Sequence, residues 1–478
     1  MRGAHNRSLD GLAFAAAVFF GLYGNDWLFS AAIGVLWAIW RLLADRDGPP
    51  ILAIALTYQW IQVTAGMFYA AILGRTLLPM LSVDYRPIVT ISLISLLALS
   101  AGLYAGRRWA IGRWSPTQVA RPDLALTWGF LIAAYGAAIV AEASARRLAF
   151  EYPSLTQPIL ALMSVRLITL YILLRRLAQP KFRVLAIAGL TAFEAVLNAT
   201  GYFANFREPL VLAIVAVLEV FDWRKREQVV AVAAFAGALV VCSLVWINIR
   251  ATFRVDIDTR ESFGTSARLD RIGSLASDWW NRGDSNHFDD VDFLVERVWA
   301  VYYPALAMKR VPAVIPHTDG ELMKAAIAHV LQPRIFFPDK PELPSDSDLV
   351  RKYSGVFVAG REQNTSIAFG YVAESYVDFG VPLMFAPMVA FGVMVGLIYG
   401  LFQRLIRHAE IRIPVVVVSF WVGLFLFERS WANTIGFSLT VYAYVGAAAV
   451  LLDRFLLIKF EAPAPLHHDA SAVWPAGR

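Results

Sequence analysis

The stretch "VVAVAAFAGALVVCSLVWINI", residues 229–249, contains no charged side chain and is long enough to cross the hydrocarbon core of a bilayer as a helix. Similar apolar runs recur along the chain, and they predict twelve candidate spans. These lie at residues 9–23, 27–43, 51–73, 87–106, 123–142, 155–177, 184–201, 208–222, 229–249, 380–403, 413–428 and 435–456. The first, eighth and eleventh are short, so a re-entrant or interfacial helix among them is an alternative. The sequence therefore predicts an all-α polytopic membrane protein with about twelve transmembrane helices.

The composition agrees with this fold class. Of the 478 residues, 58% are hydrophobic and 17% are charged, and the mean hydropathy is +0.55. The net charge of +6 does not indicate a nucleic-acid partner, because Lys and Arg cluster at the ends of apolar runs, where they orient membrane helices. The single cysteine, Cys242, lies inside an apolar run, which excludes a disulfide framework and a thiolate metal cluster.

The distribution of Lys and Arg between alternate short connections predicts the orientation of the chain. Most basic residues fall in one set of connections, which we assign to the cytoplasm because positive charge is enriched there. The other set holds only Arg75, Arg86, Arg146, Arg147, Arg207 and Arg429. Both termini are therefore predicted to be cytoplasmic. The basic N-terminus precedes an apolar stretch without a signal-peptide cleavage site, so we expect a retained first helix.

This orientation divides the chain into four parts. Residues 1–250 are expected to form about nine membrane helices, and residues 251–379 a large, partly helical extracytoplasmic loop. Residues 380–457 are expected to form about three further membrane helices. Residues 458–478, rich in Ala and Pro, are expected to be a disordered cytoplasmic tail. Within the loop, helical spacing of apolar residues predicts helices over 291–308, 320–331 and 367–379.

The loop also contains a polar, proline-rich stretch, "QPRIFFPDKPELPSDSD", at residues 332–348. Its prolines restrict the backbone, so Arg334 and Lys340 can be held with little entropy lost on binding. Together with Arg361, and with Arg250 and Arg254 at the membrane exit, they place five cations on a side where few are expected. Guanidinium groups bind phosphate bidentately, which favours a diphosphate-bearing lipid as ligand. The alternatives are a solvated charged face and, for the prolines, a rigid surface turn.

Two carboxylates follow, in "NTSIAFGYVAESYVDFG" at residues 364–380. Glu374 and Asp378 are four residues apart and share one face if the segment is helical. A partly buried carboxylate at the membrane surface can act as a general base on a sugar hydroxyl. The alternative is that Glu374 forms an ion pair with Arg361 or Arg334.

Polar residues also occur within the predicted spans. Arg166 lies near the middle of the sixth span, and Glu194 and Asn198 lie one helical turn apart on the seventh. Ionisable groups inside a membrane normally face a partner or a cavity, so these residues form either a structural ion pair or the polar wall of a substrate cavity. The histidines have no metal-ligand spacing, and no nucleotide-binding motif is present, so we expect neither a metal nor a cofactor.

Two segments resemble the Wzy-type polysaccharide polymerases, the bacterial O-antigen and oligosaccharide repeat-unit polymerases. They are "PRIFFPDKP" at 333–341 and "TSIAFGYVAESYVDFG" at 365–380, which precedes a membrane span. The resemblance places Arg334 and Lys340 in the Pro-Arg and Lys-Pro elements of the family, and Glu374 and Gly380 in its Glu-containing element. It implies an inner-membrane glycosyltransferase that polymerises repeat units carried on undecaprenyl diphosphate, without a nucleotide sugar, and for which a chain-length regulator is a possible partner.

Two other functions remain open from the sequence. The first is an O-antigen ligase, a related type of enzyme that favours a loop histidine with arginines, for which His287, His317 and His329 are available. The second is a transporter or flippase for lipid-linked oligosaccharide, in which Arg166 and Glu194 would line the path. Internal repeats would favour transport, and the sequence contains none that we detect.

Overall fold

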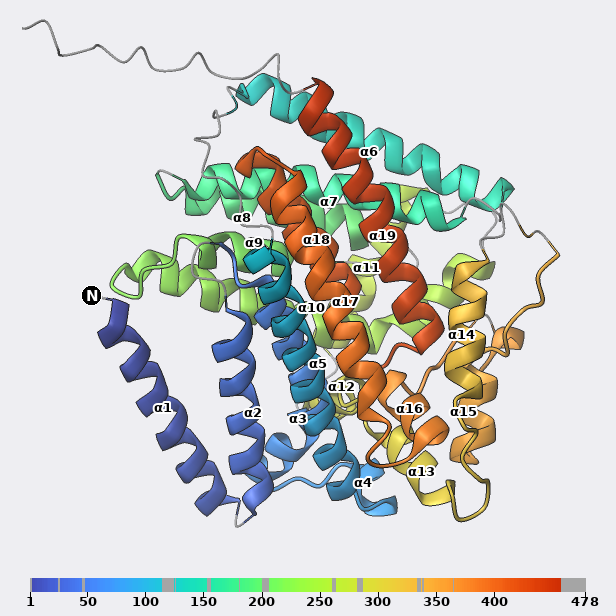
Figure 1. Ribbon diagram of the computed structural model, residues 1–478. Helices are drawn as coiled ribbons and strands as arrows, with labels where there is room; N and C mark the ends of the chain where they lie inside the picture. Colours follow the sequence, from blue (N-terminus) through green and yellow to red (C-terminus); the bar gives the residue numbers. More distant parts are fainter. Residues whose placement is uncertain are drawn as a thin grey trace, which may run out of the picture.

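The computed structural model of the protein is helical throughout the part of the chain that it describes (Figure 1). The described residues are 2–456 except 25, 45–47, 114–123, 125, 153–155, 180, 200–205, 260–263, 282–286, 333–336, 338 and 364. The predicted tail at 458–478 lies outside them. Within the described ranges the regular elements are helices and no strand is present, as an all-α fold requires.

Each of the twelve predicted spans overlaps one helix. The first nine are α1 (Arg2–Tyr23), α2 (Trp27–Leu43), α3 (Ile51–Leu73), α5 (Arg86–Arg113), α6 (Trp128–Glu151), α7 (Thr156–Ala178), α8 (Val184–Ala199), α9 (Arg207–Glu219) and α10 (Arg226–Thr259). The last three are α17 (Phe385–Leu405), α18 (Ala409–Leu424) and α19 (Trp431–Leu451), and a short π-helical turn, η3 (Leu452–Leu456), extends α19. A short additional helix, α4 (Leu78–Ser82), precedes α5.

Six of the helices in the described residues are both long and apolar enough to cross a membrane, which supports a membrane protein. The six segments are Ile51–Leu73, Arg86–Gly112, Trp128–Ala145, Arg226–Ile257, Phe385–Leu405 and Trp431–Phe455. Asp10–Tyr23, Trp27–Leu43 and Val184–Ala199 are shorter apolar helices. The structure therefore supports several membrane spans, while the predicted total of twelve is not confirmed.

The most extensive helix packing joins α5 to α17, two helices separated by most of the chain. A Cβ atom at Gly102 would lie 2.4 Å from the Val389 carbonyl oxygen, and one at Gly392 would lie 2.5 Å from the Leu99 carbonyl oxygen. Glycine is thus required at these positions, because two backbones occupy the space of a side chain, as in other membrane helix pairs with small residues at the interface. The contacts advance in the same direction along both helices, so α5 and α17 are parallel.

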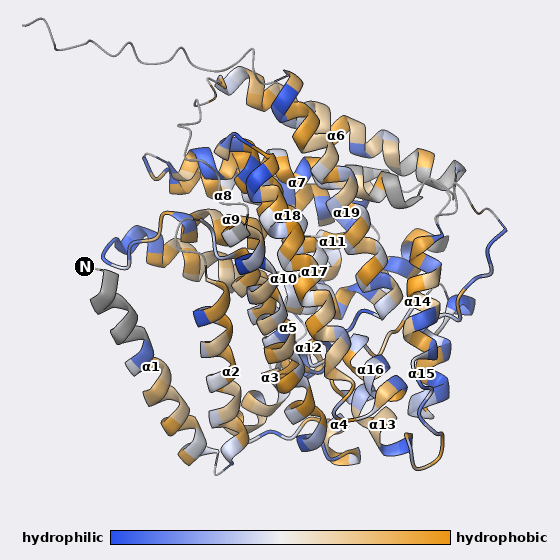
Figure 2. Ribbon diagram, in the orientation of Figure 1, coloured by the Kyte–Doolittle hydropathy of each residue, from blue (hydrophilic) through white to orange (hydrophobic). Residues whose placement is uncertain are grey.

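The predicted loop has its own helical structure and a small hydrophobic core. Its helices are α11 (Thr265–Trp280), α12 (His287–Val298), α13 (Tyr302–Arg310), α14 (Glu321–Leu331), α15 (Asp346–Ser354) and α16 (Tyr371–Phe379), with a 3₁₀ turn, η2 (Arg361–Gln363). The core contains Val311, Val350, Tyr353, Phe369 and Val377, among others. Figure 2 shows hydrophilic residues on α14 and α15, in contrast to the hydrophobic α17 and α19.

The helices expected within the loop are only partly correct. The expected helix over 320–331 matches α14, and the one over 367–379 begins later, at Tyr371. The single helix expected over 291–308 is wrong, because the chain breaks between α12 and α13, where the Ala300 N–H donates to the Gln62 carbonyl of α3 at 2.9 Å. The helix is interrupted at this contact with α3, although the helical spacing of apolar residues continues through it.

Candidate anion-binding site

Five arginine side chains from four separate parts of the chain interact in one cluster, which we call the arginine cluster. Its members come from the first residue of α9, the C-terminal part of α10, the end of α12 and the connection between α18 and α19. They are Arg207, Arg250, Arg254, Arg297 and Arg429. Two carboxylates, Glu208 and Glu428, contact them. Among the described residues, guanidinium groups therefore exceed carboxylates in the cluster, which gives this part of the chain a net positive charge.

Two ion pairs and a tyrosine connect the members of the arginine cluster. Arg297 forms a bidentate pair with Glu428, with N–O distances of 3.0 and 3.3 Å. Arg207 pairs with Glu208 at 2.9 Å. The hydroxyl of Tyr58 on α3 forms a hydrogen bond with Arg207. The negative charge of Glu428 raises the pKa of Arg297, which therefore stays charged.

Aromatic rings support the guanidinium groups of Arg207 and Arg429. The two guanidinium carbons lie 4.4 and 5.3 Å from the centre of the Phe425 ring, and Arg429 also lies 4.8 Å from the Phe437 ring. Arg429 donates a hydrogen bond to the Val422 carbonyl at 2.9 Å. Burial and the positive charge of Arg207 lower the pKa of Arg429 to about 10, so it is still charged at neutral pH. Two guanidinium groups thus lie against the same Phe425 ring, and a bound anion would reduce the repulsion between them.

Arg250 is the member of the arginine cluster with the least favourable electrostatic surroundings. Its half-buried side chain is repelled by the charges of Arg297 and Arg254. Among the described residues it has no ion pair and no hydrogen-bond acceptor. Partial burial and the like charges of its neighbours both disfavour the charged guanidinium group, so this position favours a negatively charged ligand.

The connection between α18 and α19 is held from α3. Gln62 donates to the Phe425 carbonyl at 2.8 Å and accepts from the Phe427 N–H at 3.2 Å. Gln59 donates to the Leu424 carbonyl and accepts from the Tyr371 hydroxyl at 2.6 Å. These bonds fix the backbone that carries Glu428 and Arg429, so both charges are positioned before any ligand binds.

Glu374 lies in the interior, with 3% of its surface exposed. Its Oε2 atom accepts from the Trp431 N–H at 2.8 Å, whereas Oε1 is buried without a hydrogen-bond partner among the described residues. Burial raises the pKa of Glu374 to about 8, and the nearby charges of Asp346 and Asp378 act in the same direction. The side chain is therefore mostly neutral at pH 7. The alternative in which Glu374 pairs with Arg361 is wrong, because Arg361 binds Glu342, and the other partner considered, Arg334, lies outside the described residues.

Asp378 receives hydrogen bonds at the start of α14. Its carboxylate is fully buried and accepts from the backbone N–H groups of Leu322 and Met323 at 3.0 and 2.8 Å, and from the Thr318 hydroxyl. The first N–H groups of a helix lack partners within the helix, and a carboxylate satisfies them and complements the helix dipole. Asp378 therefore joins α16 to α14.

Two of the other predicted diphosphate ligands in the loop, Lys340 and Arg361, lie outside the arginine cluster. Lys340 donates to the His329 carbonyl of α14 at 2.8 Å. Arg361 forms an exposed ion pair with Glu342 at 2.6 Å. Arg334 lies outside the described residues. Of the five predicted ligands, the structure thus places Arg250 and Arg254 in the arginine cluster, while the contacts of Lys340 and Arg361 are made within the loop.

The expected pairing of Arg166 with Glu194 is present. Arg166 binds Glu194 at 2.9 Å, Asn198 at 2.8 Å and a second carboxylate, Glu142, at 3.1 Å. The Tyr135 hydroxyl donates to Glu194. Arg166, Glu142 and Glu194 are all buried. The network links α6, α7 and α8 through polar contacts, which favours a structural ion pair over the polar wall of a substrate cavity.

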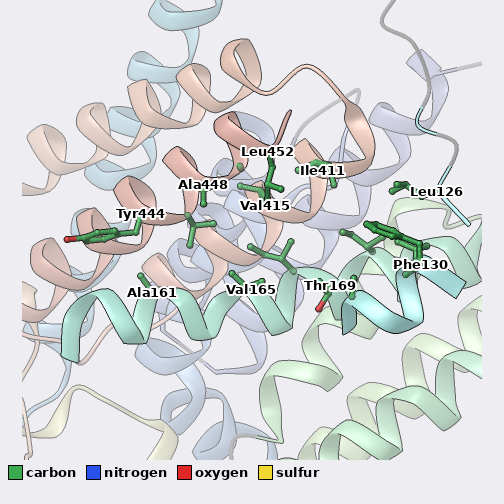
Figure 3. Close-up of a pocket in the computed structure, with 16 residues that line it drawn as sticks. Leu126, Phe130, Ala161, Val165, Thr169, Ile411, Val415, Tyr444, Ala448 and Leu452 are labelled. Atoms are coloured by element: carbon green, nitrogen blue, oxygen red, sulfur yellow. The ribbon is translucent and has the colours of Figure 1, made fainter. Parts of the chain in front are cut away.

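An apolar cavity of about 210 Å³ lies between α6, α7, α18 and α19 (Figure 3). Leu126, Phe130, Ala161, Val165, Thr169, Ile411, Val415, Tyr444, Ala448 and Leu452 are labelled among its lining residues in the figure. Its walls are almost entirely hydrocarbon, so it suits an apolar ligand or chain. The helices α18 and α19 that form one side of this cavity are joined by the connection that carries Glu428 and Arg429.

A protein-family model, described as a domain of unknown function (DUF8712), matches residues 131–419, which is more than half of the chain. The chain belongs to the DUF8712 family. No curated protein and no solved structure matches it. Four arginines of the cluster, Arg207, Arg250, Arg254 and Arg297, lie within the DUF8712 match. Arg429 and its neighbour Glu428 follow the end of that match.

The ligands predicted from the sequence of this DUF8712 protein do not include Arg207, Arg297 or Arg429. The sequence marks Arg207 and Arg429 only as cations on the side where few are expected. A local signal exists, because each is adjacent to a glutamate in an otherwise apolar setting, in "FREP" at 206–209 and "FERS" at 427–430. Isolated charge pairs at the ends of apolar runs thus marked the cluster, but only the fold brings them together.

Proposed function

We propose that this protein is a membrane glycosyltransferase that polymerises oligosaccharide repeat units carried on undecaprenyl diphosphate into a surface polysaccharide. The observation that carries the proposal is the arginine cluster, in which Arg250 has no ion pair with any residue that the structure describes. Breaking a sugar–diphosphate bond leaves negative charge on the departing diphosphate. Arginine side chains fixed in advance around that position stabilise the charge as it develops, without reorganising at the moment of reaction.

The proposal includes a membrane orientation. In it, twelve spans cross the inner membrane, both termini are cytoplasmic, and residues 251–379 face outward. All five arginines of the cluster then lie toward the outer face, where lipid-linked repeat units would be joined. The parallel packing of α5 with α17 is compatible with this arrangement, because it requires Arg86 and Phe385 to lie on the same side.

The apolar cavity is the proposed binding site for the lipid part of the substrate. A prenyl chain is hydrocarbon and must remain in the membrane while its diphosphate meets the arginine cluster. In our proposal part of this chain occupies the cavity between α7 and α19 (Figure 3). The growing glycan on one prenyl diphosphate is the donor, and a single lipid-linked repeat unit is the acceptor.

The experiment that tests the proposed function uses the purified full-length protein in nanodiscs with a synthetic prenyl-diphosphate-linked repeat unit. Polymer should form with release of prenyl diphosphate. Arg250→Gln should reduce the rate by about 10²-fold or more, the typical loss when one group stabilising a transition-state charge is removed. Lys309→Gln, a change on α13, serves as a control and should leave the rate unchanged. Polymer formation that is unaffected by Arg250→Gln would remove the arginine cluster from the mechanism.

Lipid analysis of a deletion strain distinguishes the proposal from the two alternatives. Loss of a polymerase leaves glycan that stops at one repeat unit. Loss of a ligase leaves long polymer that is not delivered, and loss of a flippase leaves single units on the cytoplasmic side. Either of the last two outcomes would contradict the proposed function.

A further inference from the structure

Glu428 is a carboxylate that lies within the arginine cluster and can still be reached from outside. Its side chain is 31% exposed, whereas that of Glu208, the other carboxylate that contacts the cluster, is 12% exposed. Glu374, the carboxylate that the sequence suggested, is buried. Of these three carboxylates, Glu428 is the one that a bound substrate could contact.

The position of Glu428 is fixed by its surroundings. The preceding residue, Phe427, donates its N–H to Gln62, and Trp431, three residues later, donates its N–H to Glu374. The carboxylate itself is held by two hydrogen bonds from Arg297. A catalytic group held by its neighbours needs little reorganisation before reaction, which is the usual condition for efficient proton transfer.

We propose that Glu428 is the general base that accepts a proton from the attacking hydroxyl of the acceptor sugar. This inference rests on the proposed function and adds to it the group that activates the acceptor. In the step, the acceptor oxygen forms a bond to the anomeric carbon of the donor. The bond between that carbon and the diphosphate oxygen breaks, and its electron pair leaves with the prenyl diphosphate beside the arginine cluster. The hydroxyl proton moves to Glu428, so the charges and atoms balance.

The ion pair with Arg297 is compatible with this role. The bidentate pair uses one lone pair of each carboxylate oxygen, and each oxygen keeps another that can accept a proton. Arg297 also holds the carboxylate in one orientation through these two hydrogen bonds. Arg250, Arg207 and Arg429 supply further positive charge, so Glu428 need not leave Arg297 for the diphosphate to bind.

The competing explanation is that Glu428 only holds Arg297 in place. The Glu428→Gln variant distinguishes the two explanations, because glutamine can still accept a hydrogen bond from Arg297 but cannot take up the proton. With the nanodisc assay and the prenyl-diphosphate-linked repeat unit, we expect Glu428→Gln to polymerise 10²- to 10⁴-fold more slowly than the parent. Glu362→Gln, at an exposed pair with Arg351, is the matched control and should polymerise normally.

Sodium azide supplies the decisive second measurement. Azide is a nucleophile that needs no deprotonation, so Glu428→Gln should transfer the donor glycan to azide and release prenyl diphosphate at a rate near that of the parent with azide. Arg297→Gln, which weakens the diphosphate site, should lose transfer to azide as well. Normal polymerisation by Glu428→Gln, or failure of this variant with azide, would overturn the assignment of Glu428. If the parent protein releases no prenyl diphosphate with either nucleophile, the proposed function itself fails.

Discussion

The Oε2 atom of Glu374 accepts a hydrogen bond from the backbone N–H of Trp431 at 2.8 Å, and this bond joins α16 to the first residue of α19. The indole N–H of Trp431 donates to Ser375 at 2.7 Å, so two bonds connect the same pair of helices. Through this buried hydrogen bond, Glu374 helps to fix the backbone that follows Glu428 and Arg429. The carboxyl group is buried, and its raised pKa makes stability depend on pH.

Glu374→Gln should stabilise the protein progressively more as the pH rises from about 5 to 8. The pKa of Glu374 is about 8 in the folded protein and 4.5 in its ordinary state, so folded parent protein retains a proton that the unfolded chain loses. The parent therefore loses up to about 1.4 kcal/mol of stability per pH unit in this range, and little more above pH 8. Glutamine does not titrate, so the variant does not lose this stability as the pH rises. Thermal unfolding in nanodiscs at pH 5–9 measures the difference between the two proteins.

The control for this measurement is Glu362→Gln. The pKa of Glu362 is lowered by the hydrogen bonds that its carboxylate accepts, first from its own backbone N–H and then from Arg351, so this carboxylate is ionised in both states above pH 5. Its substitution should give a difference in unfolding temperature that is the same at every pH tested. A flat profile for Glu374→Gln would show that Glu374 is ionised in the folded protein at neutral pH.

The same Glu374→Gln variant should still polymerise. Its side chain is 3% exposed and its Oε2 atom is occupied by Trp431, so an acceptor sugar has no direct access to it. The contrast with Glu428→Gln in one assay decides which carboxylate activates the acceptor. Accumulation of single repeat units by Glu374→Gln, at normal protein abundance, would restore the general-base role that the sequence suggested.

Gly106→Val should prevent the packing of α5 against α17. A Cβ atom at Gly106 would lie 2.2 Å from the Val393 carbonyl oxygen, and two helix backbones would have to separate to admit it. Overpacking of this kind costs about 1–3 kcal/mol or more. Gly112→Val, on the same helix, is the control because its Cβ would meet no atom within 4 Å. The amount of monodisperse protein extracted in mild detergent should fall for the first variant only, and equal yields would contradict this packing.

Arg166→Leu should destabilise the protein by about 3–5 kcal/mol. The change leaves Glu142 and Glu194 without the guanidinium group that pairs with both of them in the interior. The triple variant Arg166→Leu, Glu142→Gln, Glu194→Gln removes the unpaired charges and should recover part of the loss. Thermal unfolding and the amount of protein in the membrane provide the measurements. Normal stability of Arg166→Leu would mean that the two carboxylates need no cationic partner.

Ala448→Phe should impair the use of substrates with long lipid chains. The new ring would occupy the apolar cavity, which Ala448 lines (Figure 3). We expect about a tenfold higher KM for an undecaprenyl-linked substrate and no change for one with two or three isoprene units. Ala447→Phe, at an exposed neighbouring position outside the cavity lining, is the control. An equal effect on short and long chains would place the lipid elsewhere.

Much of the fold could be predicted from the sequence because apolar runs of membrane length determine helices almost independently of their neighbours. The runs at 27–43 and 51–73 coincide with α2 and α3 at both ends. The loop was less predictable. α15 begins with a capping box of Ser345 and Asp348, whose spacing is visible in "SDSD", but its helix is only nine residues long and largely polar.

The candidate site was only partly predictable, since it depends on contacts between distant parts of the chain. Arg250 and Arg254 were identified from their position at a membrane exit. The sequence groups Arg361 with them because it lies in the same loop, yet Arg361 forms an ion pair with Glu342, nineteen residues earlier in that loop. The Arg297–Glu428 pair spans 131 residues, and nothing in either local sequence indicates the other.

The close packing of α5 with α17 also constrains the order of biosynthesis. Nearly three hundred residues separate Gly102 from Gly392, so the ribosome synthesises α17 on the order of tens of seconds after α5. Until then the glycine surface of α5 has no permanent partner. During that interval other nascent helices, lipids or an insertase must cover it, and the early helices can reach their final arrangement only when translation is nearly complete.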